Sequence, residues 1–268
     1  MNDEALWGVQ VLSVGRSVIA GPEVFWMSHW DETLPLAFNI TVARRGKVIA
    51  LINTSPPDTT VSIEREFPRM RYLHDAPRGD LVRTQDEYIV HALARVGLQP
   101  SDITHVILTP LELYTTSTLR LFRSATIAMS RQGWIHFHTT HDHPHDSRWR
   151  SFDRATLIDL ATDSWGRVRL LDDEDQIAPG LRTWWAGAHH RGSLVVEIDT
   201  SVGVVAVSDA YFYAENVHTM TPIGLCENIY EALRCYQRVQ ATAHHVIGIH
   251  DPSVFERYPD GLIAAEAR

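Results

Sequence analysis

The segment Val96-Gly-Leu-Gln-Pro-Ser-Asp-Ile-Thr-His-Val-Ile-Leu-Thr109 is the centre of the predicted architecture, because it joins a helix to a buried strand. Upstream of it, Thr84 and Glu87 form a capping-box pair that predicts the start of the helix, and Gly97 predicts its end. Downstream, the compact apolar run at its end is typical of a buried strand, and Pro110 terminates that strand.

Short runs rich in β-branched residues predict strands on both sides of this segment. They cover residues 9–15, 36–44, 48–53, 125–130, 168–171, 181–185, 193–198, 202–207 and 245–249. Helices are expected at 131–137, 152–162 and 227–241, and an acidic turn at 172–175. Strands and helices in this order predict an α/β (α+β) chain with two sheets packed face to face and helices outside, in one domain spanning residues 1–268.

Composition excludes several classes of protein. The chain has 268 residues and a net charge of −9, which argues against nucleic acid or an anionic membrane as the main partner. Two cysteines, Cys226 and Cys235, are too few for a disulfide framework. The first residues lack the pattern of a signal peptide, and no apolar run has the ~18 residues of a membrane span. We therefore expect a cytoplasmic protein that acts on a small molecule.

Four junctions of the chain resemble a known family. Ala50-Leu-Ile-Asn-Thr-Ser55 is similar to a strand and turn that usually read Leu-Val-Asp-Thr-Gly, and the helix-to-strand segment quoted above is similar to the one before the family's metal-binding loop. Ala188-His-His-Arg-Gly-Ser193 resembles a Gly-His-Thr-Pro-Gly-His turn, and residues 207–216 and 248–252 match two further ligand loops. In this order, over roughly residues 35–255, they resemble the metallo-β-lactamase superfamily, most closely its N-acyl-homoserine-lactonase branch.

The resemblance implies a four-layer αββα sandwich with the active site along one edge where the sheets meet. It also implies a hydrolase that acts on a small-molecule lactone, ester or cyclic amide. Because this branch often forms dimers through its early loops, the resemblance further implies a homodimer.

The metal-binding loop departs from the family pattern H-x-H-x-D-H. Pro110, Glu112, Tyr114 and Thr115 stand where the pattern has its three histidines and its aspartate, and Asn53 replaces the aspartate of the earlier turn. Proline and threonine have no useful zinc-ligand chemistry, whereas a glutamate is an ordinary ligand. The two-metal centre of the family therefore cannot be carried over unchanged.

Three ligand positions of the family survive, at His189, Asp209 and His250. With Glu112 the set reaches four, which is enough for one divalent metal, Zn²⁺ first and Mn²⁺ or Fe²⁺ as alternatives. Such a metal would lower the pKa of a bound water and polarise a carbonyl group. A site that works without a metal is the alternative.

Other side chains are candidates for proton transfer or substrate contact. His190 and Tyr114 are the candidate proton-transfer groups. Candidate substrate-binding residues are Tyr211, Phe212 and Tyr213 after the expected strand at 202–207, together with His136 and His138. If the last two lie on an extended segment, they face the same way. His141, His143 and His145 are interpreted as a solvated loop.

Three functions are compatible with these residues. The leading hypothesis is a hydrolase with an altered, mononuclear metal site. The second is a lyase or isomerase that uses histidine and tyrosine acid–base chemistry without a metal. The third is a non-catalytic member of the fold that binds a ligand.

Overall fold

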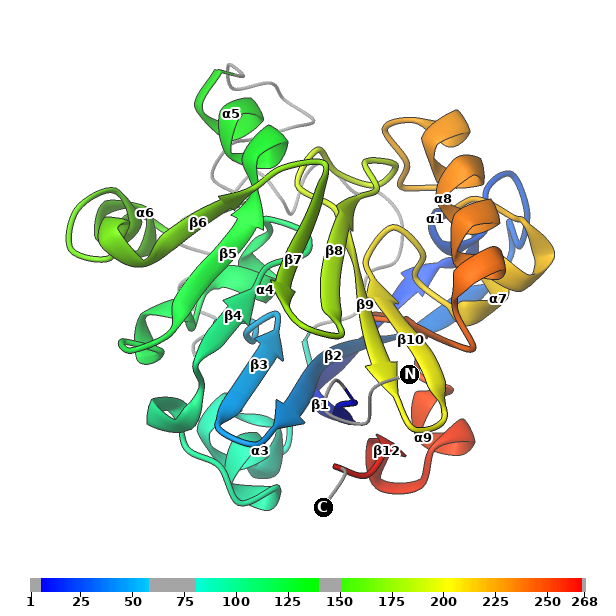
Figure 1. Cartoon of the computed structure of the whole chain (residues 1–268). Helices are drawn as coiled ribbons and strands as arrows, with labels where there is room; N and C mark the ends of the chain where they lie inside the picture. Colours follow the sequence, from blue (N-terminus) through cyan, green and yellow to red (C-terminus); the bar gives the residue numbers. More distant parts are fainter. Residues whose placement is uncertain (1–5, 58–80, 140–150, 267–268) are drawn as a thin grey trace.

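The computed structural model describes residues 6–57, 81–139 and 151–266. In this part of the chain, strands form a seven-stranded sheet in the order β12-β1-β2-β3-β4-β5-β6 and a five-stranded sheet in the order β11-β10-β9-β8-β7. Figure 1 shows these strands, with helices on the outside. The four-layer αββα sandwich is therefore confirmed.

The strands have the following bounds. They are β1 (Gly8–Ala20), β2 (Thr33–Arg45), β3 (Val48–Ile52), β4 (His105–Ile107), β5 (Thr126–Ser130), β6 (Val168–Leu171), β7 (Glu174–Ala178), β8 (Leu181–Trp185), β9 (Leu194–Thr200), β10 (Gly203–Ser208), β11 (His245–Gly248) and β12 (Leu262–Ala264).

The α-helices and 3₁₀ turns connect the strands. The α-helices are α1 (Gly21–Val24), α3 (Ile89–Arg95), α4 (Leu113–Thr116), α5 (Arg131–Thr139), α6 (Arg154–Ala161), α7 (Ala214–Thr219), α8 (Ile229–Thr242) and α9 (Val254–Arg257). The 3₁₀ turns are η2 (Gln85–Glu87), η3 (Pro100–Asp102), η4 (Leu119–Leu121), η6 (Trp165–Arg167) and η7 (Pro259–Gly261). No described helix has both the length and the apolar character needed to cross a bilayer.

Side chains that alternate along the strands form the apolar layer between the two sheets. In β9 and β10, Val196 and Val207 pack between the sheets, whereas Val195 and Ala206 face the helices on the other side. All four side chains are fully buried. Because these strands are covered on both faces, they appear in the sequence as continuous apolar runs rather than as an alternating pattern.

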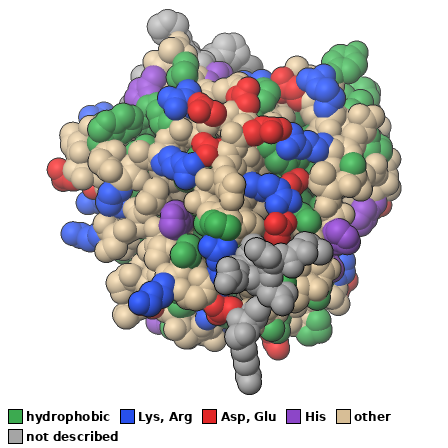
Figure 2. Space-filling model, in the orientation of Figure 1, with side chains coloured by type: hydrophobic (Ala, Val, Ile, Leu, Met, Phe, Trp, Pro, Cys, Tyr) green, Lys and Arg blue, Asp and Glu red, His purple; other side chains and the backbone are tan. Residues whose placement is uncertain are grey.

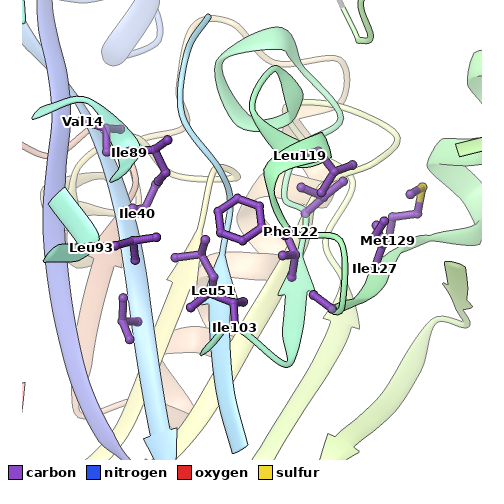
Figure 3. Packing of buried hydrophobic residues seen from close by; sticks show 14 of the residues in the cluster. Val14, Ile40, Leu51, Ile89, Leu93, Ile103, Leu119, Phe122, Ile127 and Met129 are labelled. Carbon is purple, nitrogen blue, oxygen red and sulfur yellow. The ribbon is translucent and has the colours of Figure 1, made fainter. Parts of the chain in front are cut away.

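Helices cover the outer face of each sheet. On the seven-stranded sheet, Ile89 and Leu93 of α3 pack against Ile40, in a cluster that also holds Leu51 and Phe122 (Figure 3). On the five-stranded sheet, α7 and α8 pack together over the outer face (Figure 1). On the face drawn in Figure 2, acidic and basic side chains are interspersed.

Most predicted elements are present, with three corrections. The acidic run at 172–175 is not only a turn, because β7 begins at Glu174. The capping box at Thr84 starts the 3₁₀ turn η2, and α3 begins only after it. The last long helix begins at Ile229, two residues after the predicted start at 227.

The directions of the strands bring several loops to one edge. β3, β4, β5 and β6 run parallel to one another, and β10 runs parallel to β11. The carboxyl ends of parallel neighbours lie at the same edge of a sheet. Glu112 therefore follows β4, Asp209 follows β10 and His250 follows β11 at such ends.

Candidate functional site

Asp209 is the most deeply buried carboxyl group of the predicted site. It is fully buried directly after β10, and both of its oxygens are hydrogen-bonded to hydroxyl groups. Ser193 donates to Oδ2, and the hydroxyl of Thr109 is bonded to Oδ1. Segments from both sheets therefore meet at this one carboxyl group.

Thr109 is held by Asn53 from the end of β3. The Asn53 side chain accepts a hydrogen bond from the Thr109 amide at 2.7 Å and donates one to its carbonyl at 2.6 Å. Asn53 itself has a positive φ of 65°, a conformation that asparagine tolerates better than most residues. This pair of bonds fixes the segment that carries the Thr109 hydroxyl.

Burial raises the pKa of Asp209 to about 7, although the bonds from Ser193 and Thr109 act in the opposite direction. The hydrogen-bond geometry agrees with a neutral carboxyl group. The Thr109 hydroxyl has one proton, yet it lies 2.8 Å from the Leu194 carbonyl as well as beside Asp209. If Asp209 carries a proton and donates it to Thr109, the Thr109 hydroxyl can donate to Leu194, and every group is satisfied.

His189 and His250 are each fixed through one ring nitrogen. Nδ1 of His189 donates to the Leu225 carbonyl at 2.6 Å, and Nδ1 of His250 donates to the Ala37 carbonyl at 2.8 Å. With the proton on Nδ1, Nε2 of each ring is the acceptor. Metal-binding histidines also use this tautomer. The Phe212 ring packs against both imidazoles, with centroid distances of 5.1 and 4.7 Å.

His190 and Glu112 form an imidazole–carboxylate pair. His190 Nε2 lies 3.7 Å from Glu112 Oε1, and the two side chains are 11% and 8% exposed. The Gly192 amide donates to His190 Nδ1 at 2.9 Å, so Nε2 carries the proton of the neutral ring and faces Glu112. This pair brings an imidazole N–H group and a carboxyl group together, both of them nearly buried.

His136 lies beside this pair. Its ring centroid is 6.2 Å from that of His190. A close approach of two backbones permits this, because a Cβ on Gly133 of α5 would lie only 2.4 Å from the Gly192 Cα. His138 lies on the same helix but is exposed and packs against Trp134. Both histidines therefore lie on a helix rather than on an extended segment.

An ionic clamp holds the loop that carries His189 and His190. Arg191 donates to Glu231 at 2.6 Å and to Glu227 at 2.6 Å, and its guanidinium lies 5.1 Å from the Trp185 ring centroid. Glu231 also accepts from the Ala188 amide at 3.0 Å. The bonds from Arg191 and Ala188 outweigh burial and hold the pKa of Glu231 below its usual value.

The three aromatic residues after β10 point to different places. Tyr211 is fully buried and packs against Tyr236 of α8. Phe212 lies between the two imidazoles described above. Tyr213 is half-buried, and its hydroxyl donates to the Pro35 carbonyl.

Tyr114 lies beside His250 rather than beside His190. Its ring centroid is 5.1 Å from that of His250 and 5.7 Å from that of Phe38. These side chains line a narrow pocket that also includes Asn39. The two candidate proton-transfer groups, His190 and Tyr114, thus have different neighbours. His141, His143 and His145 lie outside the described residues.

Comparison with known proteins identifies the fold. No family model matches the sequence, and no curated protein matches it. Among solved structures, an N-acyl homoserine lactone hydrolase with N-hexanoyl-L-homoserine at its catalytic metal center matches with a TM-score of 0.74 and 17% identity, over 93% of this chain and 95% of that one. A probable metal-dependent hydrolase from Staphylococcus aureus has a TM-score of 0.70 at 12% identity, over 91% and 89% of the chains. The chain has the metallo-β-lactamase fold.

A third similar structure, the dizinc quorum-quenching lactonase AidC, matches this metallo-β-lactamase fold with a TM-score of 0.67 and 13% identity, over 98% of this chain and 91% of that one. These identities establish the architecture alone. Whether this chain's own residues fit a metal ion depends on its side chains.

The described side chains do not fit a metal centre. In residues 6–57, 81–139 and 151–266, no group of three or more His, Cys, Asp or Glu residues is placed to hold a metal ion. The four expected ligands therefore do not converge there. Phe212 lies against both His189 and His250, and both oxygens of Asp209 are bonded to hydroxyls.

The sequence did not predict that the hydroxyl groups of Thr109 and Ser193 are the hydrogen-bond partners of Asp209. Thr109 and Ser193 each stand at the end of a matched segment, but a threonine or serine there has no distinctive spacing. The available signal was that residues 110, 112 and 115 are Pro, Glu and Thr rather than histidines, so a buried Asp209 would need other partners.

Proposed function

We propose that this protein is a hydrolase of a small lactone, ester or cyclic amide, and that Glu112 and His190 carry the chemistry without a metal. The observation that carries the proposal is the pair's geometry, with Nε2 of His190 facing Glu112 Oε1 at 3.7 Å. The solved structures of the same fold include lactonases and other hydrolases, which supports the reaction class.

The two side chains have complementary roles in the proposed reaction. The Glu112 carboxylate accepts a proton from a water molecule as the water oxygen attacks the substrate carbonyl carbon. The Nε2–H group of His190 donates a hydrogen bond to the carbonyl oxygen as it becomes negative. When the carbon–oxygen or carbon–nitrogen bond breaks, the proton on Glu112 passes to the leaving atom, so the carboxylate is restored.

His190 is suited to donate a hydrogen bond rather than to act as the base. Its Nδ1 accepts from the Gly192 amide at 2.9 Å, so the ring proton lies on Nε2. The neutral imidazole therefore presents an N–H group at Nε2. We assign the base to Glu112 and place His136 at the rim of the site. Tyr114, which packs against His250, has no part in the proton transfer.

The proposal assigns no step to a metal. The resemblance implied Glu112, His189, Asp209 and His250 as ligands of one divalent ion. In the described part of the chain, Glu112 instead lies next to His190, and Asp209 is hydrogen-bonded to Ser193 and Thr109. A carboxylate and a neutral imidazole are enough for the proton transfers above.

The test is hydrolysis of a panel of lactones, esters and cyclic amides by the full chain in the presence of a metal chelator. Glu112→Gln should lower kcat by roughly 10²- to 10⁴-fold, because the amide cannot accept a proton. Glu215→Gln, which makes the same change on an exposed face of α7, should leave kcat unchanged. Full activity of Glu112→Gln, or complete loss of activity with the chelator, would contradict the proposal.

A second candidate is a non-catalytic protein that binds a small molecule. It is favoured by the packing around His250, which is 3% exposed and lies against the Phe38, Tyr114 and Phe212 rings. For this candidate, the same panel would show binding in calorimetry without turnover, and Glu112→Gln would leave the affinity unchanged.

A further inference from the structure

A second pocket lies far from the Glu112–His190 pair. It is a solvent-accessible cavity of about 290 Å³, close to the lower end of the range for small-ligand sites. Its lining comes from η4 and the segment after it, from α6 and from η6. The lining residues, which we call the arginine pocket, are Arg120, Arg123, Asp159, Asp163, Ser164 and Arg167.

The arginine pocket and the candidate active site lie at opposite edges of the seven-stranded sheet. Arg123 precedes β5 and Arg167 precedes β6, whereas Glu112 follows β4 and His136 follows β5. These three strands are parallel, so their starts and their ends lie at opposite edges. A ligand in the arginine pocket would not be the substrate of the Glu112–His190 pair.

Among the residues that the structure describes, two of the three arginines have no carboxylate partner. Within the described residues, Arg120 and Arg123 make no hydrogen bond or ion pair, although several other arginines pair with carboxylates at 2.6–2.8 Å. Guanidinium groups match the geometry of phosphate and carboxylate groups by forming two parallel hydrogen bonds. Two unpaired guanidinium groups at one cavity, in a chain with a net charge of −9, are therefore a local site for an anion.

The base of the arginine pocket is rigid and internally bonded. Arg167 donates to the Ala125 carbonyl at 2.5 Å and to Ser164 Oγ at 2.6 Å. Ser164 is 1% exposed and donates to Asp159 Oδ2 at 2.6 Å. Since Asp159 and Arg167 are bonded to the same serine, Arg120, Arg123 and Asp163 are the charged groups left to contact a ligand.

We propose that the arginine pocket binds a small phosphorylated compound that also carries hydroxyl or amino groups. Arg120 and Arg123 bind the phosphate oxygens, and the Asp163 carboxylate accepts hydrogen bonds from the hydroxyl or amino groups. A purely anionic ligand would be repelled by Asp163, and a cationic ligand by the arginines. A ligand with both an acidic and a donor end satisfies all three side chains.

Isothermal titration of the full chain with glycerol 3-phosphate and with inorganic phosphate, at fixed ionic strength, tests this proposal. We expect saturable binding, with glycerol 3-phosphate the tighter of the two. Arg120→Ala and Arg123→Ala should each weaken both probes by at least about tenfold, because each removes charge-assisted hydrogen bonds. Asp163→Asn should weaken glycerol 3-phosphate alone.

Arg95→Ala is the matched control, because Arg95 is an exposed arginine on α3 outside the arginine pocket. It should leave the affinity for both probes unchanged, and the melting temperatures of all variants should stay close to that of the parent chain. Absence of saturable binding, an equal loss of affinity in Arg95→Ala, or equal affinity for the two probes would overturn the proposal. None of these measurements depends on hydrolytic activity, so they stand apart from the proposed reaction.

Discussion

Ser193 donates a hydrogen bond to Asp209, and this bond joins the loop before β9 to the end of β10 at a point where both side chains are completely buried. The other carboxyl oxygen of Asp209 is bonded to Thr109 from the opposite sheet. Hydroxyl groups from both sheets thus satisfy this buried carboxyl group. This arrangement predicts how the protein responds to mutation, pH and chelators.

Removal of the Ser193 hydroxyl, which donates a hydrogen bond to Asp209, should destabilise the fold. Ser193→Ala leaves Asp209 Oδ2 without its donor, and a buried unsatisfied acceptor costs about 1–3 kcal/mol. Urea unfolding should show this loss as a lower midpoint with an unchanged slope. Thr219→Ala removes a hydroxyl from an exposed position of α7 and should change the stability by less than about 0.5 kcal/mol. Equal stabilities of the two variants would contradict the structural role of Ser193.

The raised pKa of Asp209 predicts that stability falls as the pH rises. The folded chain keeps a proton on Asp209 up to about pH 7, whereas an unfolded aspartate loses it near its ordinary value of 3.8. Between these values the folded state binds more protons, so the free energy of unfolding decreases with pH and levels off above pH 7. A shift of about three pKa units corresponds to on the order of 4 kcal/mol.

Asp209→Asn removes this titration while retaining a donor and an acceptor. Chemical unfolding of both proteins at pH 5 and pH 8 isolates the effect of Asp209. The parent chain should lose more stability than the variant between these pH values. If both proteins lose the same amount, the carboxyl group is not protonated in the folded state.

The loop that carries His189 and His190 should not tolerate a side chain at position 187. Gly187 has a φ of +58°, and a Cβ there would lie 2.4 Å from Glu231 Oε2 and 2.8 Å from the Trp185 ring. Gly46 is a matched control, because its φ is +56° but nothing lies within 4 Å of its added Cβ. Both alanine variants pay the backbone cost of about 1 kcal/mol.

Only Gly187→Ala has the additional steric clash, so it should be less stable than Gly46→Ala by at least about 1 kcal/mol in thermal unfolding. It should also lower kcat of the proposed reaction, because His190 moves with the loop. Identical melting temperatures for the two variants would show that the Arg191–Glu231 ion pair shifts to accommodate the alanine without loss of stability.

Much of the fold was predictable because its strands are apolar and end sharply. β6 and β8 have the predicted bounds. The side chain of Val196 in β9 is fully buried, because its sheet is covered on both faces. β7 was missed because its sequence, Glu-Asp-Gln-Ile-Ala, is acidic and it lies at the edge of its sheet, where water satisfies the polar side chains. Tertiary pairing with β8 decides that such a segment is a strand.

The candidate site was predictable only in part. The sequence predicted that Glu112, Asp209 and His250 follow strands, and each of them does. The partners of Asp209 could not be predicted, because Thr109 is 100 residues away in sequence and hydroxyl bonds have no sequence spacing. His136 and His138 diverge because α5 continues to Thr139 and is not extended there.

We propose that this site works without a metal ion. The decisive measurement is elemental analysis of the full chain, purified without chelators and compared with the protein concentration. We predict far less than one zinc, manganese or iron per chain, with thermal unfolding unchanged after dialysis against a chelator. One tightly bound metal per chain, whose removal lowers the melting temperature, would show that the site depends on a metal ion.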